Sequence, residues 1–318
     1  MNNLNARTID FGAVAASVKK ITDTKSTIQV TAINHEFIDF INNVDKFSDY
    51  GLSTLGKTVG FPAPFVRELS KSDADLANEV IRNRVQNYFD KGRPEFYARC
   101  FFDKTCGVVS HKYSYFDDNQ VVDILEGSPL AKMGFQNAII TPERFHLRAI
   151  DKSNPFKVSD DSSPLYFAYF IDNSMVGQSS FKVQLGVYRL ACTNGMILPV
   201  QEFVICRQVH RGNRDIAAEF NESIAFLSQK QDALKELVMG MSGQEATIEG
   251  LKEEFRKEYL AKKLNLNRKE TDKVMELYQT VYDGHTKWGM ANAITEFARD
   301  LNDINRREFL ERAAFKVA

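Results

Sequence analysis

The feature that most constrains the fold is a series of strand-like segments that come in pairs joined by short connections. Segments 96–102 and 107–113 flank a turn at 103–105, and segments 165–171 and 181–190 flank a loop. Strands joined in this way pair antiparallel, whereas parallel strands need a crossover connection, usually a helix. The sequence therefore predicts an antiparallel sheet built from hairpins, and it argues against a doubly wound parallel sheet.

Helical patterns flank the predicted sheet. We expect a short helix with Asn34 as its N-cap, and a helical hairpin over 52–69 with a Gly-Phe-Pro turn. In the last third of the chain, apolar residues such as Phe220, Ile224 and Leu227 keep helical spacing. The fold class predicted is α+β. Its three regions are a mostly helical N-terminal region 1–94, an antiparallel sheet core 95–210, and a helical C-terminal region 211–318.

Composition limits the kinds of partner. The formal net charge is −1 over 318 residues, so any binding to nucleic acid must come from a local basic patch. The 24 Phe and 11 Tyr are either core residues or platforms on which bases stack, and both interpretations stay open. The N-terminus is polar, no apolar run is long enough to span a bilayer, and no cysteine pair has C-x-x-C spacing. We expect a cytoplasmic protein with free thiols.

One strand carries a clear basic pattern. Arg144, His146 and Arg148 alternate with apolar residues, so they share one face of the strand while Phe145 and Leu147 share the other. Such a basic face can track a nucleic-acid backbone, or it can be a solvated sheet face balanced by acids elsewhere; the two are about equally supported. The candidate phosphate contacts are Arg99, Lys112, Arg144, Arg148, Lys182, Arg189, Arg207 and Arg211.

Catalytic and metal-binding patterns are weak. Cys106 and His111 could act as nucleophile and base, but buried, unreactive side chains are the favoured interpretation. Asp117, Asp118 and Asp123 lie at a predicted helix start, where capping accounts for them better than magnesium binding does. No phosphate loop, H-E-x-x-H or G-x-S-x-G motif is present. We therefore predict no catalytic residue, no metal and no cofactor.

Four stretches together resemble an uncharacterised family of phage- and plasmid-borne proteins that contain a domain of unknown function. They are 60–69, 109–113, 188–195 and 288–295, of which Arg-Leu-x-Cys-Thr-Asn-Gly at 189–195 is the most specific. The resemblance implies a gene carried with phage replication and recombination functions, acting inside a bacterial host cell, and it implies no activity. The order of hairpin, helix and further strands also resembles phage single-strand annealing proteins at the level of fold.

Three functions follow as expectations. The first is non-catalytic binding of single-stranded DNA in recombination or replication. The second is an interaction with a host protein of a defence system, and the third is a nuclease-like enzyme whose site is assembled from distant residues. We also expect a homo-oligomer, because the apolar stripe of Phe220, Ile224, Leu227 and Leu234 needs a surface to cover it, although the back of the sheet could serve equally well.

Overall fold

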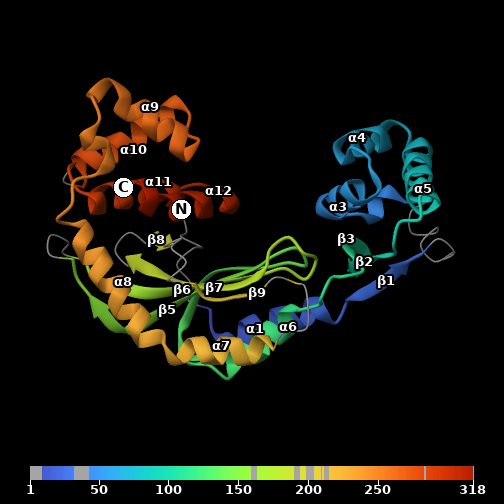
Figure 1. Ribbon diagram of the computed structural model, residues 1–318, viewed down its shortest axis with the longest axis horizontal. Coiled ribbons are helices and arrows are strands. Elements are labelled where there is room, and N and C mark those ends of the chain that lie inside the picture. The colour runs from blue at the N-terminus through green and yellow to red at the C-terminus, as the bar shows by residue number, and fades with distance from the viewer. Residues whose placement is uncertain are drawn as a thin grey trace.

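The strands form two antiparallel sheets in the computed structural model (Figure 1). The smaller sheet has the order β1-β2-β3, and the larger has the order β4-β5-β6-β7-β8, with β9 also paired to β7. All pairings between these strands are antiparallel, which confirms the predicted α+β fold built from hairpins. The strands are β1 Ser26–Val30, β2 Phe96–Phe101, β3 Lys104–Ser110, β4 Gly134–Ile140, β5 Phe145–Phe156, β6 Leu165–Asn173, β7 Phe181–Arg189, β8 Asn194–Ile197 and β9 Val204–Gln208.

The structure describes residues 9–31, 43–158, 163–189, 194–197, 204–208, 210, 215–282 and 284–317. The helix predicted with Asn34 as its N-cap lies outside these residues, and so does Arg211. Within them, no helix combines the length and the apolar character that crossing a membrane requires.

The smaller lobe is the three-stranded sheet with three helices packed on it. These are α3 Asp49–Val59, α4 Ala63–Ser72 and α5 Ala74–Asp90, and the short 3-10 helix η2 Val44–Lys46 precedes them. The predicted helical hairpin is confirmed as α3 and α4, joined through Gly60 at φ 89°. Helix α3 lies against β3 at Gly51, where an added Cβ would meet the Thr105 carbonyl oxygen at 2.1 Å. The lobe has its own apolar core, which includes Leu55, Val66 and Phe96.

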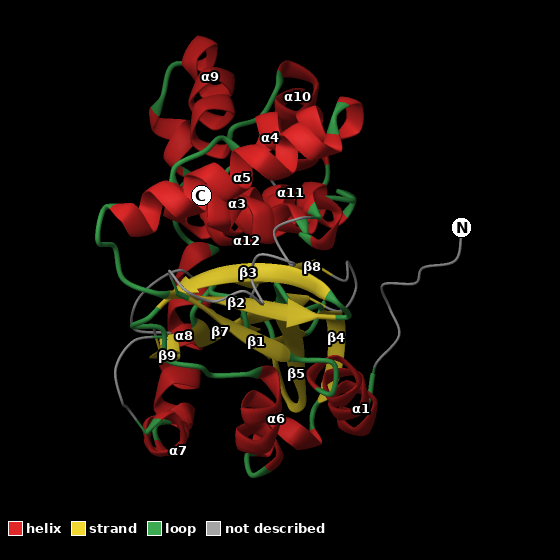
Figure 2. Ribbon diagram, turned by 90° about the vertical axis from the view of Figure 1, so that its right-hand side faces the viewer, coloured by secondary structure: helices red, strands yellow, loops and turns green. Residues whose placement is uncertain are grey.

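The larger lobe is the six-stranded sheet with helices on both faces. In Figure 1 and Figure 2, α1, α6 and α7 lie on one side of the sheet and α11 and α12 on the other. The helices of this lobe are α1 Phe11–Thr22, α6 Asp118–Glu126, α7 Ile216–Ala225, α8 Leu227–Met241, α9 Glu253–Leu264, α10 Arg268–Thr280, α11 Lys287–Arg299 and α12 Ile304–Val317, with the 3-10 helices η3 Pro129–Lys132 and η5 Thr247–Gly250.

The two faces of the larger sheet differ in chemistry. Phe145, Leu147 and Tyr169 belong to an apolar cluster that also contains Phe220 of α7 and Leu234 of α8. The opposite face carries charged side chains and is covered by α12, as described below. Phe220 and Leu234 of the apolar stripe are thus buried within their own chain, and Ile224 and Leu227 are half-buried against the same cluster. The sheet therefore covers much of the surface that was the reason given for self-association; the oligomeric state itself stays a prediction.

The region boundaries follow the topology only in part. The C-terminal region is helical as predicted, and its helices pack on the sheet. The expected division at 94/95, however, runs between paired strands, since Ser26 of β1 lies opposite Cys100 of β2. A boundary drawn from composition cannot detect a strand that pairs with a partner about 70 residues away.

Two turns differ from the prediction. Strands β2 and β3 are joined by Phe102 and Asp103 alone, both at positive φ, so the turn precedes the predicted 103–105. Asn194 and Gly195, predicted as a turn, lie in β8 opposite β7. Asp103 keeps its predicted place in the β2–β3 turn, and only the bounds of that turn change. At β8, by contrast, strand pairing overrides the local turn preference of Asn and Gly.

Candidate binding site between the two lobes

The basic face predicted on β5 is present but is not open to solvent. Arg148 is 2% exposed, and its Nη2 lies 2.7 Å from Oε2 of Glu311 on α12. Arg144 lies 2.5 Å from Glu308, one turn earlier on the same helix. The expectation that this face is exposed is wrong, because α12 presents two acids at i, i+3 spacing to a strand that presents arginines at i, i+4. In this conformation Arg148 has no surface for a phosphate.

A buried cluster of His146, Asp172 and Glu308 lies beside these pairs. The His146 Nδ1 atom is 2.8 Å from Asp172 and 3.0 Å from Glu308, so the three could in principle ligate a metal. Lys182 and Arg312 already contact Asp172, at 3.3 and 3.1 Å. Burial alone raises the pKa of Asp172, but the His146 hydrogen bond and the surrounding positive charges hold that pKa below its ordinary value. With Arg144 included, three basic side chains surround two carboxylates, which disfavours a metal cation.

Arg99, another predicted phosphate contact, is also buried. Its side chain is 2% exposed and forms an ion pair with Asp117, whose other carboxylate oxygen accepts a hydrogen bond from Lys25 at 2.7 Å. The Arg99 guanidinium also lies 4.6 Å from the ring centre of Tyr115. This arginine therefore ties β2 to the start of α6 and faces protein rather than solvent.

The remaining candidates divide into two groups. Lys182 contacts Asp172, and Arg189 donates to the Tyr282 hydroxyl at 3.3 Å, so both contact other parts of the large lobe. Lys112 and Arg207 are exposed. Lys112 immediately precedes Tyr113, and both Tyr113 and Arg207 line one pocket. The structure thus brings these two predicted cations toward the same site.

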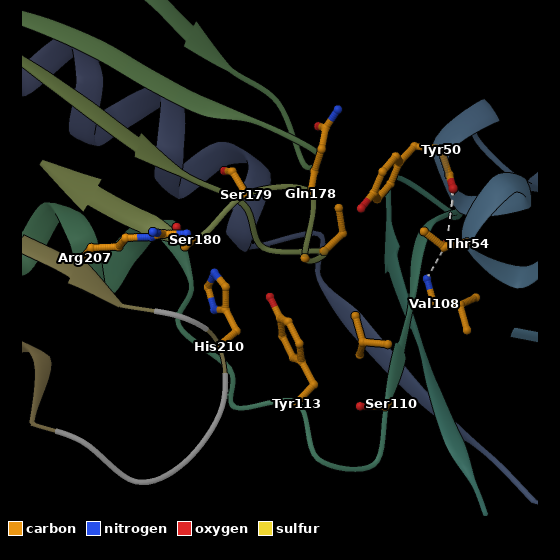
Figure 3. Close-up of a pocket in the computed structure, with 13 residues that line it drawn as sticks. Tyr50, Thr54, Val108, Ser110, Tyr113, Gln178, Ser179, Ser180, Arg207 and His210 are labelled. Carbon is orange, nitrogen blue, oxygen red and sulfur yellow. Dashed lines mark hydrogen bonds between the residues drawn. The ribbon is translucent and has the colours of Figure 1, made fainter. Parts of the chain in front are cut away.

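This pocket lies where the two lobes meet (Figure 3). Its volume is about 440 Å³, within the range of small-molecule sites. Helix α3 and strand β3 of the small lobe form one side, and the β6–β7 loop with the end of β9 forms the other. The lining residues are Tyr50, Thr54, Val108, Val109, Ser110, Tyr113, Val176, Gly177, Gln178, Ser179, Ser180, Arg207 and His210. Among these described residues none is acidic.

His210 is the most unusual side chain of the pocket. It is 6% exposed and stacks on Tyr113 with ring centres 5.0 Å apart and planes 16° apart. Neither of its ring nitrogens makes a hydrogen bond of good geometry to the described residues. Burial lowers the pKa of His210, and poorly aligned hydrogen bonds to the backbone of Ser114 and Ser179 partly offset this shift. A buried imidazole whose own contacts are this weak, and which lines a pocket, leaves room for a ligand or an ordered water to complete its hydrogen bonds.

A second buried polar group, Asp118, lies near Tyr113 without lining the pocket itself. Asp118 is fully buried at the start of α6, and burial raises its pKa to about 7. Its Oδ1 accepts a hydrogen bond from Asn173 at 2.8 Å, while Oδ2 has no partner among the described residues. The charge of Asp118 also helps to raise the pKa of Tyr113, although burial is the larger cause. Tyr113 is therefore near a carboxyl group whose pKa lies close to neutral pH.

A family model described as "Domain of unknown function (DUF932)" matches residues 105–312. The chain belongs to this family. The DUF932 match begins in β3 and ends in α12, so it includes Tyr113, Gln178, Arg207 and His210 of the pocket but not Tyr50 of α3. No curated protein and no solved structure matches the chain.

The structure argues against Cys106 and His111 as a nucleophile and its base. Cys106 is buried, and burial together with Glu143 raises its thiol pKa to about 12, so the thiolate is scarce at neutral pH. His111 is exposed just beyond the other end of β3, roughly 15 Å away along a strand. Asp123 is exposed and Asp117 pairs with cations, so the predicted acids do not converge on one point either.

Sequence reasoning missed Tyr50, Thr54 and Gln178. They come from a helix and a loop far from the strands that carried the basic pattern, and no local motif connects them. One signal was available: Gly177, at φ 83° in the β6–β7 connection, marks a tight turn that brings Gln178 and Ser179 to the pocket. His210 was missed as well: it lies three residues after the predicted contact Arg207, and no motif marks it.

Proposed function

We propose that the protein binds single-stranded DNA without catalysing a reaction, and that the pocket between the lobes takes one nucleotide. The observation that carries this proposal is the Tyr113–His210 stack beside exposed Arg207 in a pocket of about 440 Å³ that has no acidic lining among its described residues. Aromatic rings stack on any base, and arginine binds phosphate through a charge-assisted hydrogen bond. The pocket is large enough for a nucleotide and suits an anion.

The resemblance to phage- and plasmid-borne proteins supports a role in phage replication or recombination within a bacterial cell. DUF932 membership itself adds neither an activity nor a phage or plasmid origin. Under this proposal Lys112 and Arg207 contact phosphate. Arg99 and Arg148 instead hold the protein together through Asp117 and Glu311.

Fluorescence anisotropy with a labelled single-stranded oligonucleotide tests this function. We expect affinity at low salt that falls as salt rises, because bound phosphates release counterions. Arg207→Ala should weaken binding and reduce the salt slope by about 1. Arg84→Ala is the matched control, since Arg84 is equally exposed but lies on α5, away from the pocket. Absence of any binding at low salt overturns the proposal, and equal loss in the two variants moves the site elsewhere.

Three further measurements test the alternative functions and the predicted oligomer. Pull-down from host lysate, with and without nuclease treatment, separates a host-protein partner from a nucleic-acid bridge. Incubation of DNA with the protein and divalent metal tests for cleavage, which would favour a nuclease over a binding protein. Light scattering at micromolar concentration, with and without DNA, tests the predicted homo-oligomer.

A further inference from the structure

The polar groups of the pocket are divided between its two ends. In Figure 3, Arg207 and Ser180 lie at one end, Tyr50 and Thr54 at the other, and the His210–Tyr113 stack between them. The first end belongs to the large lobe and carries the cation. At the small-lobe end, the Thr54 hydroxyl accepts a hydrogen bond from the Val108 N–H at 2.9 Å and donates within its own helix, so it is already engaged.

The large-lobe end has buried polar atoms without partners. Within the described part of the chain, the buried Ser179 Oγ has no hydrogen-bond partner, and the buried ring nitrogens of His210 make no hydrogen bond of good geometry, only weak ones to the backbone of Ser114 and Ser179. A buried polar group left unpaired costs free energy, so such groups in a native protein usually meet a ligand or an ordered water. Here a hydroxyl, an imidazole and a guanidinium come together, and each can donate a hydrogen bond to oxygen.

The surrounding charges also favour an anion at this end. The acids near this end are paired with basic groups: Asp117 contacts Arg99 and Lys25. Asp172, which lies across Lys182 from Arg207 in the sheet, contacts His146, Lys182 and Arg312. The field at the Arg207 end is therefore set mainly by cations. Phosphate oxygens match such a set of donors better than a neutral group does.

We propose that Arg207, His210 and Ser179 form a phosphate subsite, and that the base of the same nucleotide stacks at the Tyr113 and Tyr50 end. The ligand class is a nucleoside monophosphate unit, free or within a strand. The choice of a nucleotide as the ligand rests on the proposed function. The preference of the Arg207 end for phosphate, however, is tested without DNA. In this arrangement the β6–β7 loop and the end of β9 bind the phosphate, and the small lobe covers the base.

Isothermal titration of the full-length protein with thymidine and with its 3′- and 5′-monophosphates tests the subsite. At least one monophosphate should bind roughly tenfold or more tightly than thymidine, as expected for charge-assisted hydrogen bonds. Arg207→Ala should remove this preference while leaving thymidine binding within a few fold. Tyr113→Leu should weaken all three ligands but keep the preference. Arg84→Ala serves as the control that changes neither.

The outcomes separate this inference from the proposed function. Equal binding of thymidine and both monophosphates to the wild type overturns the subsite, and so does a preference that survives in Arg207→Ala. If the oligonucleotide binds while no monophosphate is preferred, only the subsite is lost. If a monophosphate is preferred while no oligonucleotide binds, the subsite holds and single-stranded DNA is not the ligand. His210→Phe adds a readout of the ring nitrogens, since it keeps an aromatic ring and should reduce the monophosphate preference.

Discussion

Arg148 and Glu311 form a buried ion pair between residues 163 positions apart, with 2.7 Å between Nη2 and Oε2. Both side chains are at most 2% exposed, and the guanidinium lies 4.9 Å from the ring centre of Phe170. The pair connects the middle of β5 to the last helix. It explains why a strand with alternating arginines lies inside the protein: its partner acids are supplied by α12.

The first prediction concerns this pair. Arg148→Met should lower the free energy of unfolding by about 3–5 kcal/mol, because it leaves Glu311 buried without its partner. The double substitution Arg148→Met with Glu311→Leu should recover much of this loss, since two apolar side chains replace two charges. Urea unfolding followed by the fluorescence of Trp288, the single tryptophan, measures both. A folded double variant that binds DNA like the wild type agrees with a structural role, whereas a selective loss of DNA binding would restore Arg148 as a phosphate contact.

The second prediction concerns the β2–β3 turn. Phe102 and Asp103 adopt φ 50° and 58°, a left-handed conformation that costs L-residues roughly 1–2 kcal/mol each. Phe102→Asn and Asp103→Gly supply the residues that such a two-residue turn prefers, so each should raise the free energy of unfolding by about 1 kcal/mol. Gly92→Ala is the reciprocal control, because Gly92 has φ 67° with nothing within 4 Å of an added Cβ. Gly92→Ala should lower the free energy of unfolding through backbone strain alone. Unchanged stability in all three variants would contradict the idea that a positive φ costs free energy at these turns.

Sequence patterns predicted the parts of the fold that depend on neighbouring residues. The helical hairpin around Gly60 and the hairpin of β6 and β7 follow from local turn and periodicity signals. The burial of Arg148 does not, because the period of a strand shows which residues share a face but not what covers that face. The acids of α12 determine that this face is covered, and they lie more than 150 residues further along the sequence.

The same limit applies to the pocket. Arg207 was predicted as a phosphate contact, whereas Tyr113 was not predicted as a site residue and only lies within the stretch 109–113 that carries the resemblance. Their proximity depends on how the small lobe meets the β6–β7 loop, which pairs residues more than 60 positions apart. Sequence reasoning could therefore name some residues of the site but could not assemble them.

The third prediction tests the contact that forms the pocket. Gly107 of β3 faces Val176 of the β6–β7 loop, and an added Cβ would lie 2.5 Å from the Val176 Cβ. Gly107→Ala should displace the loop that carries Ser179, and so weaken nucleotide binding tenfold or more while lowering the melting temperature. Gly250→Ala is the control, since its added Cβ meets nothing within 4 Å. Unchanged affinity in a folded Gly107→Ala protein, measured by titration, would show that the loop position does not matter for binding.

The fourth prediction concerns pH and Asp118. Its pKa is about 7 in the folded protein against 3.8 ordinarily, because burial disfavours the carboxylate. A raised folded pKa gives a stabilising contribution that is complete below the unfolded value and is lost as pH rises toward 7. Between about pH 5 and pH 8, wild type should therefore lose close to 3 kcal/mol relative to Asp118→Asn, at 1.36 kcal/mol per pKa unit over roughly two units.

Asp118→Asn is a suitable reference because its amide oxygen can still accept the hydrogen bond from Asn173. His210 changes stability in the opposite direction: its lowered pKa means that the unfolded chain takes up the proton first as pH falls, so stability rises with pH in its titration range. That contribution is present in both proteins and cancels in the difference between them. Urea unfolding of the two proteins at several pH values, followed through Trp288, gives the difference directly. A difference that does not change with pH would mean that Asp118 stays ionised in the fold, and that Tyr113 of the pocket lies near a permanent negative charge.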